Sequence, residues 1–147
     1  MNDTHVTIAG WVGTDVTLTE VAGGHQVASF RVATTPRRLR EGEWCDGPTM
    51  WVQVKAWRRL AAHVAASVHQ GDPVVVQGRL MADVWEREDG VVVSQTELVA
   101  SSVGHDLAHG TSAFTKAVGR ERAEVRPLAG PVADGSLRTA SGAEDAA

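Results

Sequence analysis

The stretch from Thr49 to Trp57, TMWVQVKAW, constrains the fold more than any other part of the chain. Because successive side chains of a β-strand point to opposite faces, its alternate residues separate into two unlike rows. One row is Met50, Val52, Val54 and Ala56, and the other is Trp51, Gln53, Lys55 and Trp57. The first row is apolar, so the pattern predicts a strand with one face packed in a core.

The second row places an amide and an ammonium group between two indole rings. Flat rings and a cation along one row suit a ligand of stacked rings on a charged backbone, which is single-stranded nucleic acid. The alternative is a second buried face, because tryptophan side chains are mostly buried. Burial would leave Gln53 and Lys55 without obvious partners, at a cost in free energy. The pattern therefore favours an exposed row that binds a ligand.

The composition sets wide limits. A chain of 147 residues with 43% hydrophobic content can form one domain with a core and still have a tail. No run of residues approaches the ~18 apolar residues of a membrane span. The first ten residues, MNDTHVTIAG, lack the basic and apolar regions of a signal peptide. We therefore expect a cytoplasmic protein with no membrane partner.

Cys45 is the only cysteine, which excludes an intrachain disulfide. A free thiol in a reducing cytosol is the favoured interpretation. A bridge between two chains is the alternative for an unpaired cysteine.

The net charge of −4 does not by itself indicate a nucleic-acid partner, for which a local basic patch matters more. Most of the cations that precede residue 110 flank the Thr49–Trp57 stretch or the loop before it. These cations are Arg31, Arg37, Arg38, Arg40, Lys55, Arg58, Arg59, Arg79 and Arg87. Their distribution favours a basic patch.

Alternation of apolar and polar residues predicts further strands. These strands cover Thr4 to Gly13, Gln26 to Thr35, Val74 to Leu80, Met81 to Trp85 and Val91 to Ala100. Gly23-Gly24 and Glu88-Asp89-Gly90 are typical of hairpin turns. The polar segment Pro36 to Pro48 predicts a long hairpin arm.

Between the third and fourth long strands the periodicity becomes helical. Arg58 to Gln70 has apolar residues at helical spacing, and Gly71 is expected to close the helix as its C-cap. An all-β chain with one short helix at this place and glycine corners predicts a five-stranded Greek-key barrel, the OB-fold.

Beyond about His105 the periodicity is lost and large apolar residues are few. Such a segment does not offset its ordering entropy, so we expect a disordered tail. The predicted organisation is a domain over residues 1–107 and a disordered C-terminal tail over residues 108–147.

In their order and spacing, several segments resemble bacterial single-stranded DNA-binding proteins over Thr4 to Leu107. The segments are VTIAGWVGTDV, GGHQVASFRVAT, WVQVKAWRRLAA, GDPVVVQGRL and the hairpin with Trp85. The resemblance implies an OB-fold subunit of a homotetramer that binds single-stranded DNA without strong sequence preference. It implies a role in DNA replication, recombination or repair, a nucleoid-associated location and no cofactor.

Position by position, the resemblance implies that Trp51, Trp57 and Trp85 stack on bases and that Lys55 contacts the DNA backbone. Arg38 stands where many members have another stacking tryptophan, and a guanidinium can stack on a base or pair with phosphate. The predicted DNA-binding residues are Trp51, Trp57, Trp85, Lys55, Arg31, Arg37, Arg38, Arg79 and Gln53.

Besides Arg38, two further features depart from the family pattern. Met81 and Asp83 stand where other members tend to have basic residues, which makes that edge of the groove less cationic. The chain ends SGAEDAA, whereas well-studied members end in an acidic run closed by an aromatic residue that recruits other enzymes. The sequence therefore resembles an auxiliary or paralogous member, and does not predict recruitment of protein partners through the tail.

Two other classes of protein stay open as alternatives. One is an OB-fold interaction module of a replication or recombination assembly with only weak DNA contact. The other is a small metal-dependent hydrolase, for which only His105 and His109 form a close pair, without a third ligand nearby. Neither a phosphate-binding loop nor a nucleophile elbow occurs, so we predict no enzyme. The roles of Trp11 and Trp44 stay undecided.

Overall fold

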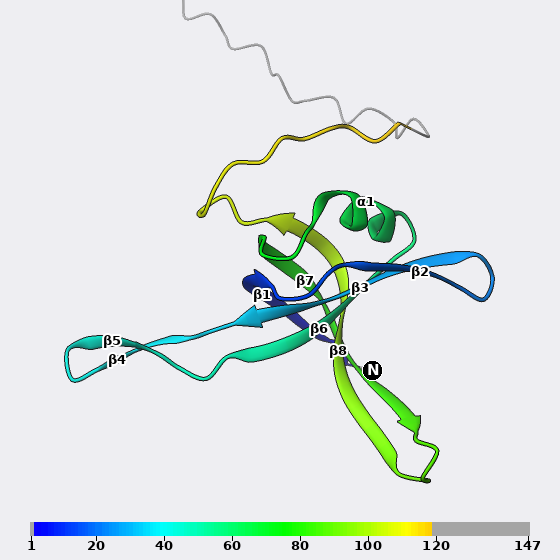
Figure 1. Cartoon of the computed structure of the whole chain (residues 1–147), viewed down its shortest axis with the longest axis horizontal. Helices are drawn as coiled ribbons and strands as arrows, with labels where there is room; N and C mark the ends of the chain where they lie inside the picture. Colours follow the sequence, from blue (N-terminus) through cyan, green and yellow to red (C-terminus); the bar gives the residue numbers. More distant parts are fainter. Residues whose placement is uncertain (1, 119–147) are drawn as a thin grey trace, which may run out of the picture. The chain divides into compact units, whose positions relative to one another are not determined.

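The computed structural model describes residues 2–118. The chain divides into a compact unit, Met1–Ala113, and a second unit, Phe114–Ala147. All helices and strands described here belong to the first unit (Figure 1). The predicted disorder of the tail falls largely on residues 119–147, outside the described residues, and stays a prediction.

The compact unit contains one helix and eight strands. In chain order they are β1 (Thr4–Val12), β2 (Thr17–Val21), β3 (His25–Thr34), β4 (Arg37–Arg40), β5 (Glu43–Asp46), β6 (Met50–Trp57), α1 (Arg59–Ser67), β7 (Pro73–Glu86) and β8 (Val92–His105). The predicted hairpins are present at Gly23-Gly24 and at Gly90, where the glycines have positive φ angles.

Five of the strands close into a barrel. The sheet order is β1-β7-β8-β6-β3-β2, and β1 also pairs with β3, which joins the two ends of the five-stranded part. All the neighbouring strands are antiparallel except β6 and β8, which are parallel. With α1 between β6 and β7, this arrangement is the OB-fold, as predicted. β2 extends the sheet beyond β3, and β4 and β5 form a separate hairpin.

The barrel interior is filled by the apolar row of each strand. Phe30 and Val32 from β3, Val54 from β6 and Leu98 from β8 are almost completely buried. Val6 and Ile8 from β1 are partly buried and pack against this core. Met50 was predicted to face the core but is 56% exposed, because β6 leaves the barrel at its first residue, where the arm begins.

The helix α1 lies at one end of the barrel (Figure 1), with Ala61 and Val64 buried against it. It is shorter than predicted, because Val68 is already extended. Gly71 was predicted to be the C-cap, but it lies farther along the chain in the turn into β7, with φ of 94°. Within the described residues, no helix is long and apolar enough to cross a membrane.

A single strand, β7, replaces the two that the sequence predicts over Val74 to Trp85. The register against β8 shifts between Gln77 and Gly78, which is a β-bulge. A Cβ at Gly78 would overlap the carbonyl oxygen of Val99, so only glycine fits here. The bend lets β7 close the barrel with its first half and extend the hairpin with its second half (bottom of Figure 1).

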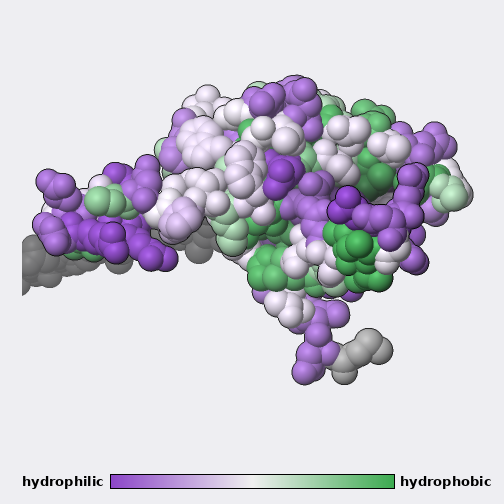
Figure 2. Space-filling view, turned by 60° about the horizontal axis from the view of Figure 1, so that its bottom comes forward, coloured by the Kyte–Doolittle hydropathy of each residue, from purple (hydrophilic) through white to green (hydrophobic). Residues whose placement is uncertain are grey.

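The predicted arm is the β4–β5 hairpin, which extends away from the barrel on the left of Figure 1. Glu41 and Gly42 at its tip both have positive φ angles, as a tight two-residue hairpin loop requires. At its base, the hydroxyl groups of Thr35 and Thr49 are hydrogen-bonded at 2.8 Å. Figure 2 shows the arm as a mainly hydrophilic projection.

Candidate nucleic-acid interface

The outward rows of four neighbouring strands form one continuous face of the barrel. Arg31 on β3 is in register with Gln53 on β6, which is in register with Glu97 on β8 and then Met81 on β7. The next row across the same strands is Ser29, Lys55, Val99 and Arg79. We call this face, with Trp51 and Trp57 at the two ends of β6, the groove face. It brings together most of the predicted site residues.

Trp51 is the most closely supported side chain of the groove face. Its indole ring lies against Gly13, where any Cβ would overlap the ring. The guanidinium carbon of Arg31 lies 5.2 Å from the ring centroid, within the range of a cation–π interaction. Arg31 is in turn positioned through its backbone, whose N–H donates to Oγ1 of Thr14 at 3.0 Å. Trp51 nevertheless remains 48% exposed, so it presents a fixed aromatic surface to solvent.

Lys55 lies at the centre of the groove face, but its charge is already paired. Its Nζ is 2.7 Å from Oε1 of Glu97 and 3.8 Å from Oδ2 of Asp83. Glu97 is only 8% exposed, so its carboxylate is nearly buried within the groove face. Gln53 is partly buried between Arg31 and Glu97 in the register of the sheet. The ammonium group that the sequence predicts for the DNA backbone is therefore compensated inside the fold.

The other two predicted stacking residues are also exposed. Trp57 ends β6 with 39% of its surface exposed, and Trp85 near the tip of the β7–β8 hairpin has 40% exposed. Trp85 follows Asp83 by two residues and therefore lies on the same face of β7. Both rings are thus available on the outer surface, at the two sides of the groove face.

Arg79 belongs to the groove face, and it lies next to an acid. Its Nη1 is 3.7 Å from Oδ2 of Asp3, and both side chains are about half exposed or more. Exposed ion pairs of this kind contribute about 0–1 kcal/mol, so a phosphate can replace the carboxylate at little cost.

Arg37 and Arg38 are placed on the arm and not on the groove face. Arg37 pairs with Asp46 at 3.5 Å, and both side chains are highly exposed. Arg38 is in register with Cys45, so the two side chains lie on the same face of the hairpin. Trp44 is in register with Leu39, and both are exposed. Cys45 is an exposed free thiol.

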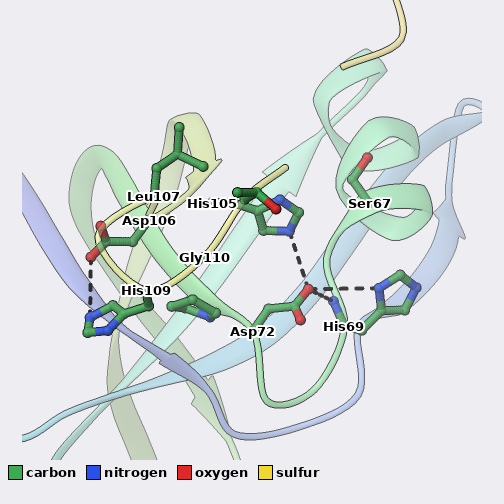
Figure 3. A pocket seen from close by; sticks show the side chains of 10 residues that line it. Ser67, His69, Asp72, His105, Asp106, Leu107, His109 and Gly110 are labelled. Carbon is green, nitrogen blue, oxygen red and sulfur yellow. Dashed lines mark hydrogen bonds and ion pairs between the residues drawn. The ribbon is translucent and has the colours of Figure 1, made fainter. Parts of the chain in front are cut away.

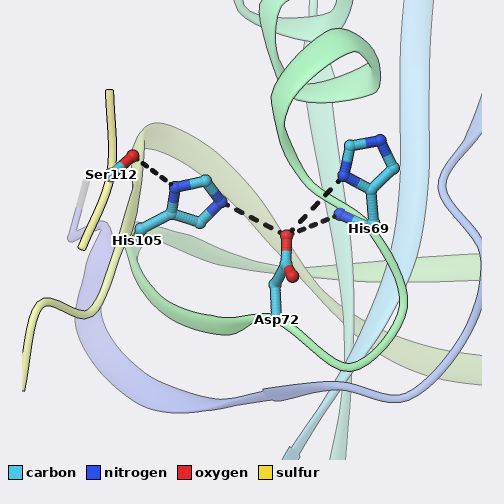
Figure 4. A network of polar contacts seen from close by, with 4 residues as sticks. All are labelled: His69, Asp72, His105 and Ser112. Atoms are coloured by element: carbon cyan, nitrogen blue, oxygen red, sulfur yellow. Dashed lines mark hydrogen bonds and ion pairs between the residues drawn. The ribbon is translucent and has the colours of Figure 1, made fainter. Parts of the chain in front are cut away.

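The close pair His105 and His109 lies elsewhere, around a hollow of about 280 Å³ at the end of β8 (Figure 3). Oδ2 of Asp72 accepts from the backbone N–H of His69 at 2.9 Å and lies 3.3 Å from Nε2 of His105. Nδ1 of His105 is 2.9 Å from Oγ of Ser112 (Figure 4). These polar groups satisfy one another and join the α1–β7 turn, the end of β8 and the segment after it.

The serine, histidine and carboxylate of this network do not have the arrangement of a hydrolase triad. In such a triad Nε2 of the histidine faces the serine and Nδ1 faces the carboxylate. Here the two nitrogens have exchanged roles, and Asp72 also binds His69. Among residues 2–118 there is no group of three or more metal-ligating side chains arranged to hold an ion.

Trp11 lies between this second region and the groove face. Its ring centroid is 4.9 Å from that of His109, with the rings tilted by 49°. The segment after β8 therefore partly covers Trp11, which stays 47% exposed. Trp11 is in register with Ala33 and Ala33 with Trp51, so Trp11 lies in the outward row next to the groove face, and its role stays open.

Comparison with known proteins agrees with this geometry. A model of the single-strand binding protein family matches residues 3–106, which cover the whole barrel. The chain belongs to this family. Its members are binding proteins, so the prediction that the chain is not an enzyme agrees with the assignment.

Individual proteins and solved structures that are similar to this chain agree with the family assignment. The chain is 43% identical over 134 residues to single-stranded DNA-binding protein 2 of Streptomyces avermitilis, covering 89% of this chain and 84% of the relative. The crystal structure of a small single-stranded DNA-binding protein from Streptomyces coelicolor superposes with a TM-score of 0.65 at 38% identity, over 75% of this chain and 100% of that one. The second single-stranded DNA-binding protein (SSBb) of Mycobacterium smegmatis gives a TM-score of 0.59 at 30% identity, over 78% and 100%.

Sequence reasoning missed two features of the groove face. Glu97 lies beside Leu98 in an alternating strand, so its outward direction could have been predicted, but its ion pair with Lys55 could not. That pair depends on the parallel register of β6 and β8. The role of Gly13 was also missed, because nothing local shows that Trp51 lies on it.

Proposed function

We propose that the chain binds single-stranded DNA without strong sequence preference, by stacking bases on tryptophan and pairing phosphates with arginine. The observation that carries this proposal is the ring of Trp51, exposed on the groove face and supported by Gly13 and Arg31. Base stacking on such a ring tolerates any sequence, because every base has a flat face. The family assignment and the names of the relatives support the same ligand.

Within this proposal the residues divide into two groups. Trp51, Trp57 and Trp85 act as stacking surfaces along the groove face. Phosphates are bound by Arg31 and Arg79 on the groove face and by Arg37 and Arg38 on the arm. Gln53 supplies hydrogen bonds between Trp51 and Lys55.

The family membership and the barrel architecture support three further proposals. The barrel domain, which the sequence bounds at 1–107, is the DNA-binding part, and it assembles into a homotetramer. The protein acts in DNA replication, recombination or repair, in the cytoplasm and associated with the nucleoid.

The test is a titration of intrinsic tryptophan fluorescence with an oligothymidine at low salt. Stacking on the exposed indoles is expected to quench the fluorescence strongly and saturably. An unchanged signal, together with no shift of the oligonucleotide in a direct binding assay, would exclude the proposal. Size determination in solution by light scattering tests the tetramer separately.

A second candidate is an OB-fold module that mainly holds other proteins of a DNA-processing assembly. The observation that favours it is the pairing of Lys55 with Glu97 and Asp83, which lowers the positive charge of the groove face. Salt-insensitive, weak binding of the oligothymidine would support this alternative, because a DNA-binding groove releases counterions on binding.

A further inference from the structure

The DNA-binding mechanism proposed above assigns no role to the two acidic residues of the groove face. A groove that binds a polyanion normally excludes carboxylates, yet Glu97 and Asp83 both lie on the groove face. Glu97 is nearly buried, and its Oε1 is at hydrogen-bonding distance, 2.7 Å, from the ammonium of Lys55. Asp83 lies 3.8 Å from the same ammonium on the other strand of the hairpin.

The charges at this point therefore sum to −1, with one ammonium between two carboxylates. Such a centre repels a phosphate, and like charges brought together at an interface lower the affinity. The cations on either side are placed differently. Arg31 lies over Trp51, and Arg79 is paired only with the exposed Asp3.

We propose that Glu97 and Asp83 hold Lys55 as an internal counterion, so that the centre of the groove excludes phosphate and limits the affinity for single-stranded DNA. This inference rests on the proposed function. In the proposed complex, the DNA backbone passes over Arg31 and Arg79, while the centre of the groove face contacts bases. Glu97 is the residue that determines this, because it is the closer and more deeply buried of the two acids.

The geometry leads to different expectations for a single and a double variant of the ion pair. Glu97→Gln keeps the size of the side chain but releases Lys55 to a phosphate. We expect roughly fivefold tighter binding of an oligothymidine at low salt, and a salt slope steeper by about 0.7 log units, the value of one additional phosphate contact. In the double variant Lys55→Gln/Glu97→Gln the local charge is again −1, as in the wild type, and no ammonium is released. Its affinity is expected to stay within about twofold of the wild type, so the gain of Glu97→Gln disappears when Lys55 is absent.

The matched control is Glu20→Gln, which changes the net charge by the same amount. Glu20 on β2 is exposed and is in register with Gln26, on the side of the sheet that bears Ala28 and opposite the groove face. The affinity of Glu20→Gln should stay within about 1.5-fold of the wild type, because Glu20 faces away from the groove face.

The experiment measures affinity and salt slope of the full chain and these variants by fluorescence titration, with thermal unfolding as a check of the fold. Tighter binding of Glu97→Gln with near-normal binding of Lys55→Gln/Glu97→Gln supports the inference. Unchanged or weaker binding of a folded Glu97→Gln overturns it, as does a gain of the same size in Lys55→Gln/Glu97→Gln, because the gain would then not come from Lys55. If Glu97→Gln unfolds, Asp83→Asn decides in its place: about twofold tightening supports the inference, and no change or weakening overturns it.

These results are distinguishable from a failure of the proposed function. If the wild type does not quench with oligothymidine, the DNA-binding proposal itself fails. If the wild type binds and the Glu97 and Asp83 variants bind equally well, only the inference about the acid pair fails.

Discussion

The centre of the groove face and the β4–β5 arm both carry basic residues, but they hold their charges in different ways. In the groove, Lys55 is partly buried and paired with two carboxylates, one of them almost inaccessible. On the arm, Arg37 has one highly exposed partner, and within the described residues Arg38 and Arg40 are in no ion pair. Cations on a projecting hairpin are thus more available to a polyanion than a cation in the sheet. Counting basic residues along a sequence does not separate the two cases.

Under the proposed function, this comparison predicts that the aromatic rings of the groove face, and not its lysine, supply most of the affinity for DNA. Trp51→Ala is expected to weaken binding of an oligothymidine by about 1–3 kcal/mol, roughly 5- to 150-fold, because one stacking surface is lost. A titration that does not depend on tryptophan emission, such as fluorescence anisotropy of a labelled oligonucleotide, measures the effect. Trp11→Ala is the comparison variant, because Trp11 is similarly exposed at 47% and neighbours Trp51 through Ala33. A smaller loss is expected, since its ring contacts His109 and not Arg31. An equal loss in both variants would contradict the placement of the groove.

The arm is expected to supply phosphate contacts that Lys55 does not. The double variant Arg37→Gln/Arg38→Gln should lower the salt slope by about 1.4 log units, two contacts of ~0.7 each, and weaken binding several-fold at moderate salt. The slope is obtained from affinities at four or more salt concentrations. If Lys55→Gln lowers the slope more than the arm variant does, the contrast between arm and groove is wrong.

The support of Trp51 offers a finer test of the groove. Gly13→Ala adds a methyl group that overlaps the indole ring, so the ring must turn away from Arg31. We expect about threefold weaker binding and a shifted tryptophan emission maximum, with about 1 kcal/mol lost in stability from the strained packing. Gly104→Ala is the control, because a Cβ there meets nothing within 4 Å. Identical behaviour of the two variants would show that Trp51 does not need the glycine.

The smallest effect is expected outside both regions. Truncation after Ala113 should leave the affinity for oligothymidine and the melting temperature unchanged, since the compact unit ends there. Truncation after Leu107 should also leave DNA binding largely intact. It should lower the melting temperature by a few degrees, because the contact between His109 and Trp11 and the hydrogen bond between Ser112 and His105 are lost. Loss of DNA binding on either truncation would place part of the site beyond the barrel.

Much of the fold could be predicted because it follows from local periodicity. The alternation in TMWVQVKAW separated buried Val54 and Ala56 from exposed Trp51 and Trp57, and burial depends on that alternation. The ends of the helix and strands were harder to predict from the sequence. The end of α1 at Ser67 and the exposure of Met50 depend on where the barrel ends, which the sequence of those residues does not state.

By itself, the sequence of this chain determined where most of the strand-forming segments lie, which side of each is apolar and which aromatic residues lie outside the core. Only the tertiary structure decided what those outward residues contact. Whether the Lys55 ammonium meets a phosphate or a carboxylate depends on the parallel pairing of β6 with β8, which brings Glu97 beside it. Whether Trp51 is held in place depends on Gly13, far along the chain. Side-chain direction follows from local backbone geometry, but the partner of an outward side chain is set by strands distant in sequence.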